Sequence, residues 1–302
     1  MNRRLPATPP ACLPAGPSRP PRHLAMPRGA WDTHAHVIGG DARYPFVPQR
    51  TYTPPSVSAD DYVAMLDTVG FDFGIAIQIS VHGSDNGPIV EALRRHPTRL
   101  RGVGAIDGSE SDEALADLRD AGVCGVRVNE LFAGGSGAGQ LQRIADRCRP
   151  LGWHIDLALH GHRLREIAPM LRGLGVRLVI DHMGWCPAAL GVGHADFQAV
   201  LELARMDDCW VKLSGAYRVS TQPPPYDDVA PFVKALVQAA PDRTVWGTDW
   251  PHVAITDPVL MPEPGMLLDV LQRHLDDTMQ LKAVLIDNPL RLYGLPGTPV
   301  HG

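Results

Sequence analysis

The chain has 302 residues, of which 44% are hydrophobic and 20% are charged, and these values are ordinary for a globular protein. The formal net charge of −5 argues against nucleic acid or an anionic membrane as the main partner, and no apolar run approaches the roughly 18 residues that a membrane span needs. The five cysteines are scattered and form no C-x-x-C pair, which indicates reduced thiols in a cytoplasmic protein.

Residues 1–29 differ in composition from the rest of the chain. They contain eight prolines and several arginines, with almost no aliphatic periodicity and no apolar segment of the kind found in secretory signals. We therefore expect residues 1–29 to form a disordered or loosely draped extension, followed by one domain over residues 30–302.

From residue 30 onward, short apolar runs alternate with stretches of helical periodicity. The eight runs cover residues 30–37, 71–80, 101–107, 124–130, 153–160, 176–183, 209–215 and 244–250. They are rich in β-branched residues and most are almost continuously hydrophobic, which is typical of buried parallel strands.

Amphipathic helices are predicted between these runs. Tyr62, Met65, Leu66 and Val69, for example, follow the spacing i, i+3, i+4, i+7 of a helix with one apolar face. Glycines stand where several helices should end before the next strand, at Gly70, Gly122, Gly152 and Gly175.

Eight strand and helix units in one chain of this length predict a single (β/α)8 barrel, the TIM-barrel fold. A doubly wound open sheet is the structural alternative, but no G-x-G-x-x-G sequence follows an early strand. The glycine-rich segment 134–139 follows the fourth run without the matching spacing, and we interpret it as a flexible loop.

In such barrels, chemistry takes place at the carboxyl ends of the strands. Seven of the eight predicted strands end in polar residues, namely His34 and His36, Ser80 and His82, Arg127 and Asn129, His160, Asp181 and His182, Arg218, and Asp249 and His252. Residues i and i+2 of a strand share a face, so His34 and His36 should point the same way. Buried charges are costly unless they serve a site, so we select His34, His36, His182 and Asp249 as the catalytic set. For His160, we weigh two alternatives equally, a role in the site and an ordinary histidine of the surface or core without a function.

Four sequence motifs carry a family resemblance. "DTHAHV" (32–37), "VIDHMG" (179–184), "VWGTDWPH" (245–252) and "NPLRLYG" (288–294) resemble the amidohydrolase superfamily, and more narrowly its lactonase branch, which includes the 2-pyrone-4,6-dicarboxylate lactonases. The resemblance extends over essentially the whole chain after residue 29. It implies a hydrolase of a carboxylated lactone, with catalysis on His34, His36, His182 and Asp249. The substrate contacts that it implies fall on Tyr52, Ser80, His82, Arg127, Arg218 and His252.

The sequence departs from that branch at two places. The pyrone dicarboxylate enzymes have further arginines shortly after the fourth-strand motif and directly after "HMG", where this chain has Ala133 and Trp185. Arginine supplies planar, bidentate recognition of a carboxylate. Because this chain lacks those two arginines, its sequence does not predict a second carboxylate on the substrate, and the identity of the second substituent is left open. Trp185 would instead offer an apolar wall or a stacking face to a ring.

The expected chemistry is the attack of water on a lactone carbonyl. Asp249 is predicted to activate the water and the three histidines to polarise the carbonyl, while Arg127 and Arg218 hold a substrate carboxylate.

The resemblance leaves metal dependence open. The wider superfamily is largely metal-dependent, whereas the pyrone lactonases work without a metal, and we favour no metal requirement. A single divalent ion such as zinc would have its candidate ligands in His34, His36, His182 and Asp249, with His160 as a further one.

Three other functions are considered. Within enzymes they are a metal-dependent decarboxylase of the amidohydrolase fold and a sugar-acid lactone isomerase, since the segments around "SGAYRVS" (214–220) and "PYDDVAPF" (225–232) are similar to the galactarolactone isomerases. The third is a non-catalytic barrel that binds a small acid. The oligomeric state is left open.

Overall fold

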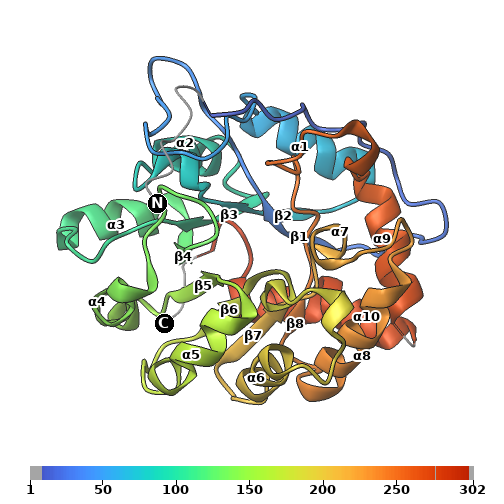
Figure 1. The fold of residues 1–302 in the computed structure, drawn as a ribbon. Coiled ribbons are helices and arrows are strands. Elements are labelled where there is room, and N and C mark those ends of the chain that lie inside the picture. The colour runs from blue at the N-terminus through green and yellow to red at the C-terminus, as the bar shows by residue number, and fades with distance from the viewer. Residues whose placement is uncertain (1–8, 276, 299–302) are drawn as a thin grey trace.

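The eight predicted strands form one parallel sheet in the computed structural model, which describes residues 9–275 and 277–298 (Figure 1). The strands follow one another around the sheet in chain order. They are β1 (Trp31–Ala35), β2 (Phe73–Ile77), β3 (Leu100–Gly104), β4 (Val123–Asn129), β5 (His154–Ala158), β6 (Leu178–Ile180), β7 (Cys209–Lys212) and β8 (Thr244–Val245).

The sheet closes between β1 and the segment that follows β8. The amide of Thr33 donates to the carbonyl oxygen of Trp246, His36 donates to Trp250, and Asp249 donates back to His34. The predicted (β/α)8 barrel is confirmed, and the doubly wound open sheet is wrong because this sheet has no free edge strands.

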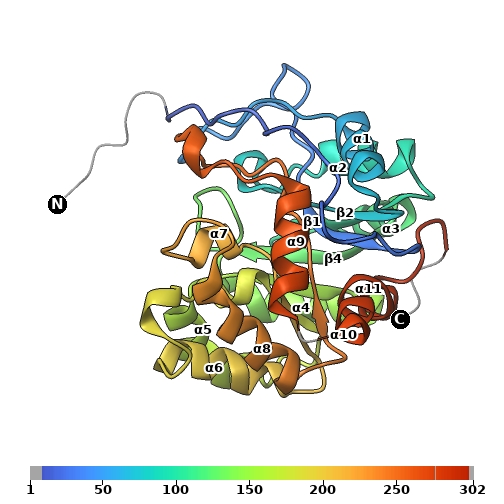
Figure 2. The same cartoon turned by 90° about the vertical axis from the view of Figure 1, so that its right-hand side faces the viewer.

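Helices surround the strands in both views (Figures 1 and 2). They are α1 (Ala59–Val69), α2 (Gly87–Arg95), α3 (Asp112–Ala121), α4 (Leu141–Cys148), α5 (Gly161–Leu171), α6 (Ala195–Ala204), α7 (Ala216–Val219), α8 (Ala230–Ala239), α9 (Pro264–His274), α10 (Thr278–Lys282) and α11 (Asn288–Tyr293). Within the described part of the chain, none of the helices has the length and apolarity required to cross a lipid bilayer.

The ends of α1 show how the sequence sets these boundaries. The Ser58 side chain accepts a hydrogen bond from the Asp61 amide, and the Asp61 carboxylate accepts one from the Ser58 amide, which forms a capping box. At the other end, Gly70 has a φ of 102°, a left-handed conformation that favours glycine and turns the chain toward β2. The other three predicted helix-stop glycines also have positive φ.

The interior of the barrel has an apolar floor. Trp31, Ile75, Val103 and other buried strand residues pack together there. Tyr293 of α11 stacks on Trp31 with 6.2 Å between ring centroids, so α11 covers the amino-terminal end of β1. A buried histidine, His154 at the start of β5, also packs on Tyr293 with 5.4 Å between ring centroids.

The amino-terminal segment follows the surface of the barrel (Figure 2). The amide of Leu13 donates to the carbonyl oxygen of Ile255, and the Asp269 carboxylate of α9 accepts hydrogen bonds from the amides of three consecutive residues, 22–24. These bonds tie residues 13 and 22–24 to the barrel, and the expectation of a disordered or loosely draped extension stays a prediction. Residues 1–8 lie outside the described residues, and the domain boundary at residue 30 stays a prediction.

Candidate active site

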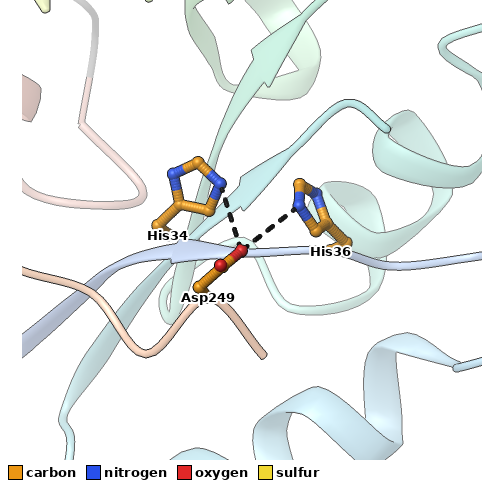
Figure 3. Close-up of side chains that lie close together, drawn as sticks. All are labelled: His34, His36 and Asp249. Carbon is orange, nitrogen blue, oxygen red and sulfur yellow. Dashed lines mark ion pairs between the residues drawn. The ribbon is translucent and has the colours of Figure 1, made fainter. Parts of the chain in front are cut away.

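The four predicted catalytic side chains meet at the carboxyl ends of the strands, and Figure 3 shows three of them, His34, His36 and Asp249. The Nε2 atoms of His34 and His36 each lie 3.8 Å from Asp249 Oδ1. His182 Nε2 lies 3.8 Å from the other carboxylate oxygen, Oδ2. All four residues are at most 2% exposed. The i, i+2 spacing of the two strand-1 histidines therefore does turn both rings toward one carboxylate.

Two of these residues have an unusual backbone conformation. His182 has a φ of 49° and Asp249 a φ of 62°, values in the left-handed region that non-glycine residues rarely adopt. The strands β6 and β8 end at Ile180 and Val245, earlier than the sequence predicts, and the two left-handed residues lie in the segments that follow these strands. Strained residues of this kind concentrate at functional sites, where packing around them holds the geometry.

Asp249 is an ionised carboxylate in a buried setting. Burial opposes its charge, but the Arg218 guanidinium and the three histidines hold the pKa of the Asp249 carboxyl well below its usual range. Arg218 contacts Oδ2 directly, and the Tyr217 hydroxyl donates to the same oxygen at 2.7 Å. Because Oδ2 has these two donors, Oδ1 is the oxygen that remains free to contact a water molecule.

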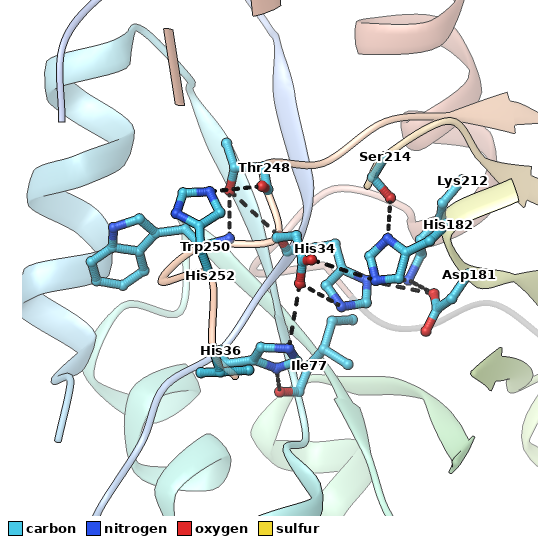
Figure 4. A network of polar contacts seen from close by, with 12 residues as sticks. His34, His36, Ile77, Asp181, His182, Lys212, Ser214, Thr248, Trp250 and His252 are labelled. Carbon is cyan, nitrogen blue, oxygen red and sulfur yellow. Dashed lines mark hydrogen bonds and ion pairs between the residues drawn. The ribbon is translucent and has the colours of Figure 1, made fainter. Parts of the chain in front are cut away.

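The three histidines are neutral near pH 7. Burial lowers the pKa of His36 to about 3 and that of His182 to about 4, and it lowers the pKa of His34 well below its usual value. The Nδ1 atom of each ring faces a protein partner, which is Ile77 O at 2.8 Å for His36, Ser214 Oγ at 2.9 Å for His182 and Lys212 Nζ at 3.3 Å for His34 (Figure 4). Each Nε2 atom is thus left to face Asp249 and the reaction space.

A small pocket opens in front of His36, His182 and Asp249, and His34, the fourth residue of the predicted catalytic set, does not line it. Its lining comprises His36, His182, Asp249, Arg127, Arg218, Tyr52, Trp185, Asn129, Phe132 and Val253. Four predicted substrate contacts line this pocket, namely Tyr52, Arg127, Trp185 and Arg218. A fifth, Ser80, lies beside it, with its Oγ 3.5 Å from the Tyr52 hydroxyl. The cavity volume is only about 10 Å³, which is room for about one water molecule. The aromatic pair Phe132 and Trp185, with 6.3 Å between ring centroids, forms part of its wall.

Three predicted contacts lie outside the pocket. His82 Nε2 accepts the Gly39 amide at 3.1 Å, and His252 Nε2 faces the carbonyl oxygen of Thr248 at 3.2 Å. His160 is exposed, with its ring stacked on His162 and its edge toward Trp185. A substrate role for these three residues stays a prediction.

The structure adds buried charged residues that the sequence analysis did not select. Lys212 and Asp156 are 0% exposed, and the Lys212 ammonium forms ion pairs with Asp156 and Asp181. Burial opposes the charge on Lys212, but these two carboxylates raise its pKa, so it is protonated. The signal was present in the sequence, since each of these two residues interrupts an otherwise apolar strand and such a charge is costly without a partner.

The comparisons with known proteins place this barrel in a family. The sequence pattern of the amidohydrolase family matches residues 31–295. The chain belongs to the amidohydrolase family. This amidohydrolase is 38% identical to a 4-sulfomuconolactone hydrolase of Rhizobium radiobacter over 91% of its own length and 93% of that protein. It is 36% identical to a 2-pyrone-4,6-dicarboxylate hydrolase of Comamonas testosteroni, covering 92% and 94% of the two chains. An apo crystal structure from Agrobacterium tumefaciens, 28% identical, superposes with a TM-score of 0.83 over 94% of this chain and 99% of that one.

Amidohydrolases often hold a metal, and two groups of donor atoms in the described residues could be considered for one. They are His34 with His36 and Asp249, and His34 with Asp181 and His182. Both carboxylates already face buried cations, however, since Arg218 contacts Asp249 and both Arg127 and Lys212 contact Asp181. A divalent ion would add two positive charges beside these fixed cations, and Coulomb repulsion is strong in a buried site. The residues present therefore fit a metal poorly, and the predicted further ligand His160 belongs to neither group.

Proposed function

We propose that this amidohydrolase hydrolyses a lactone that carries at least one anionic substituent. The observation that carries the proposal is a buried, ionised Asp249 facing three neutral imidazoles beside two arginines. This set combines a base for water, polar groups for a carbonyl oxygen and cations for an anionic substituent. The names of the two hydrolase relatives support the same class of substrate, a cyclic ester bearing carboxylate or sulfonate groups.

The reaction follows from the positions of these groups. Asp249 Oδ1 accepts a proton from a water molecule as the water oxygen attacks the lactone carbonyl carbon. Imidazole N–H groups that face the reaction space stabilise the tetrahedral oxyanion, in a site that needs little reorganisation because its rings are fixed by their Nδ1 partners. The ring C–O bond then breaks, and the proton held on Asp249 Oδ1 passes to the leaving oxygen through His182 Nε2, which lies 3.8 Å from the other carboxylate oxygen, Oδ2. The product is an open-chain hydroxy acid or its keto form.

Arg127 and Arg218 stand on two sides of the pocket, and they are the natural partners of an anionic substituent. Arg127 is 7% exposed and is oriented by Asp181, with Nε and NH2 at 3.1 and 3.0 Å from Oδ2. Arg218 lies over the ring of Trp185, 5.4 Å from its centroid. The aromatic side chains Trp185 and Phe132 then supply the apolar contact for the ring of the substrate.

The function is tested with a panel of purified lactones and proton release as the readout. The panel contains a sulfonated muconolactone, 2-pyrone-4,6-dicarboxylate, a monocarboxylated lactone and neutral lactones of the same ring sizes. We expect turnover of an anionic lactone with one proton released per ring opened. Release of carbon dioxide instead would support the decarboxylase, and binding of all anionic lactones without turnover would support the non-catalytic barrel.

We infer that no resident metal is needed, because each carboxylate of the two candidate groups is already neutralised by a buried cation. Treatment with a chelator followed by dialysis should leave kcat unchanged while metal analysis shows less than one ion per chain. Loss of activity that zinc restores would contradict this inference.

The lowered pKa values predict an unusual pH profile. Asp249 is ionised and the histidines are neutral well into acid, so kcat/KM should show no inflection near pH 6.5, the ordinary pKa of histidine. Activity should fall only as the pH approaches 4, where His182 takes up a proton and can no longer relay one. Circular dichroism over the same range separates this loss from unfolding, because histidines that are neutral when folded and charged when unfolded lower stability progressively below pH 6.5. An acid limb centred between pH 6 and 7, with the fold intact, would show that the catalytic histidines are not neutral.

A further inference from the structure

A buried ammonium group lies directly behind His34 and is not used by the reaction described above. Lys212 Nζ lies 2.5 Å from Asp156 Oδ2. It also lies 3.1 Å from Asp181 Oδ1 and 3.3 Å from His34 Nδ1, two residues that are labelled beside it in Figure 4. All four side chains are 0% exposed, so solvent does not compete for these contacts. The cluster is held by β1, β5, the segment after β6 and β7, which places it beneath the catalytic groups.

The contact between Lys212 and His34 determines which ring nitrogen carries the proton. An ammonium group has only donors, so it can bond to His34 Nδ1 only if that nitrogen presents its lone pair. Asp181 Oδ1 is 3.4 Å from the same nitrogen, but it already faces the ammonium at 3.1 Å, so the three N–H donors of Lys212 are matched by three acceptors, Asp156 Oδ2, Asp181 Oδ1 and His34 Nδ1. A neutral imidazole carries one proton, and on His34 it is therefore on Nε2, which has no hydrogen-bond partner among the described residues.

His36 has the opposite arrangement. Its Nδ1 faces the carbonyl oxygen of Ile77 at 2.8 Å, and a carbonyl oxygen can only accept. The proton of neutral His36 is therefore on Nδ1, and its Nε2 presents a lone pair. The two histidines of the H-x-H motif thus point a donor and an acceptor at the same oxygen, Asp249 Oδ1, each from 3.8 Å.

We propose that Lys212 is a positioning residue that fixes His34 in the Nε2–H form and thereby makes His34 the donor to the lactone oxyanion. His36 cannot share that role, and instead accepts a hydrogen bond from the attacking water. The water then donates one hydrogen bond to Asp249 Oδ1, which takes that proton during the attack, and the other to His36 Nε2, and these two bonds direct an oxygen lone pair toward the carbonyl carbon. The catalytic consequence rests on the proposed function, but the tautomers of the two histidines do not.

The tautomers are measured directly by nitrogen NMR of the full-length protein labelled with ¹⁵N in its histidines, near pH 7. His34→Asn and His36→Asn variants assign the two rings by the signals that disappear. We expect an unprotonated Nδ1 and a protonated Nε2 for His34, and the reverse for His36. A protonated Nδ1 on His34 would overturn the proposal whether or not any lactone is hydrolysed.

A pair of variants isolates the ammonium group. Lys212→Met alone would leave two buried carboxylates without their cation and destabilise the fold, so it is combined with Asp156→Asn. Asp156→Asn alone is the matched control, because it keeps the ammonium beside His34. We expect the double variant to lose the Nε2–H signature of His34 and to lower kcat about 100-fold with little change in KM, the loss typical of one oxyanion donor. The control should keep the signature and most of kcat. Unchanged His34 signals in the folded double variant would show that Lys212 does not set the tautomer.

Discussion

Replacement of Asp249 by asparagine should lower kcat by about 10³-fold, because an amide cannot take the proton of the attacking water. The change keeps the shape of the side chain, and the amide oxygen can still accept from Tyr217 and Arg218, so the fold should persist. Steady-state kinetics with the best lactone of the panel, together with circular dichroism, measure the effect.

Asp257→Asn is a matched control for this variant. Asp257 is exposed and caps the short helical turn Pro258–Leu260 in the long segment that follows β8. It should leave kcat unchanged. If Asp249→Asn retains kcat within a few fold of the native value, Asp249 is not the base and the proposed reaction is wrong.

Replacement of Arg127 by methionine should raise KM for anionic lactones about 10- to 100-fold and leave neutral lactones almost unaffected. A charge-assisted hydrogen bond contributes about 1.5–3 kcal/mol, which corresponds to that range. Asp181, which loses one partner, keeps the Lys212 ammonium at 3.1 Å, so the buried carboxylate remains paired. The measurement is KM and kcat for an anionic and a neutral lactone of the same ring.

Two further variants sharpen this result. Arg127→Lys keeps the charge but loses the planar fork, and it should give an intermediate KM. Arg94→Met removes an exposed arginine of α2 and should change nothing. An equal loss for neutral and anionic lactones in Arg127→Met would mean that Arg127 supports the pocket without binding the anion.

The architecture could be predicted from the sequence because buried parallel strands have a simple signature. Runs such as 71–80 are apolar, short and separated by amphipathic helices, and each of the eight gave a strand. The ends of the strands could not be predicted in the same way. His182 and Asp249 leave the ladder through left-handed conformations, which depend on the packing of the loops and have no local sequence signal when the residue is not glycine.

That His34, His36, His182 and Asp249 lie together could be predicted, because they follow strands and the H-x-H spacing turns two rings to one side. His82, His252 and His160 were selected by the same rule, but the turn of a loop decides where such side chains point, and these three lie outside the pocket. Lys212 and Asp156 were missed for the converse reason. They stand inside apolar strands, and only the closed barrel shows that they neutralise each other behind His34.

The central claim, hydrolysis of a lactone by water, is tested most directly by turnover in ¹⁸O-labelled water followed by mass spectrometry of the product. Hydrolysis predicts one ¹⁸O atom in the newly formed carboxylate of each product molecule. A product that is an isomer of the substrate and carries no label would contradict the claim and establish a lactone isomerase.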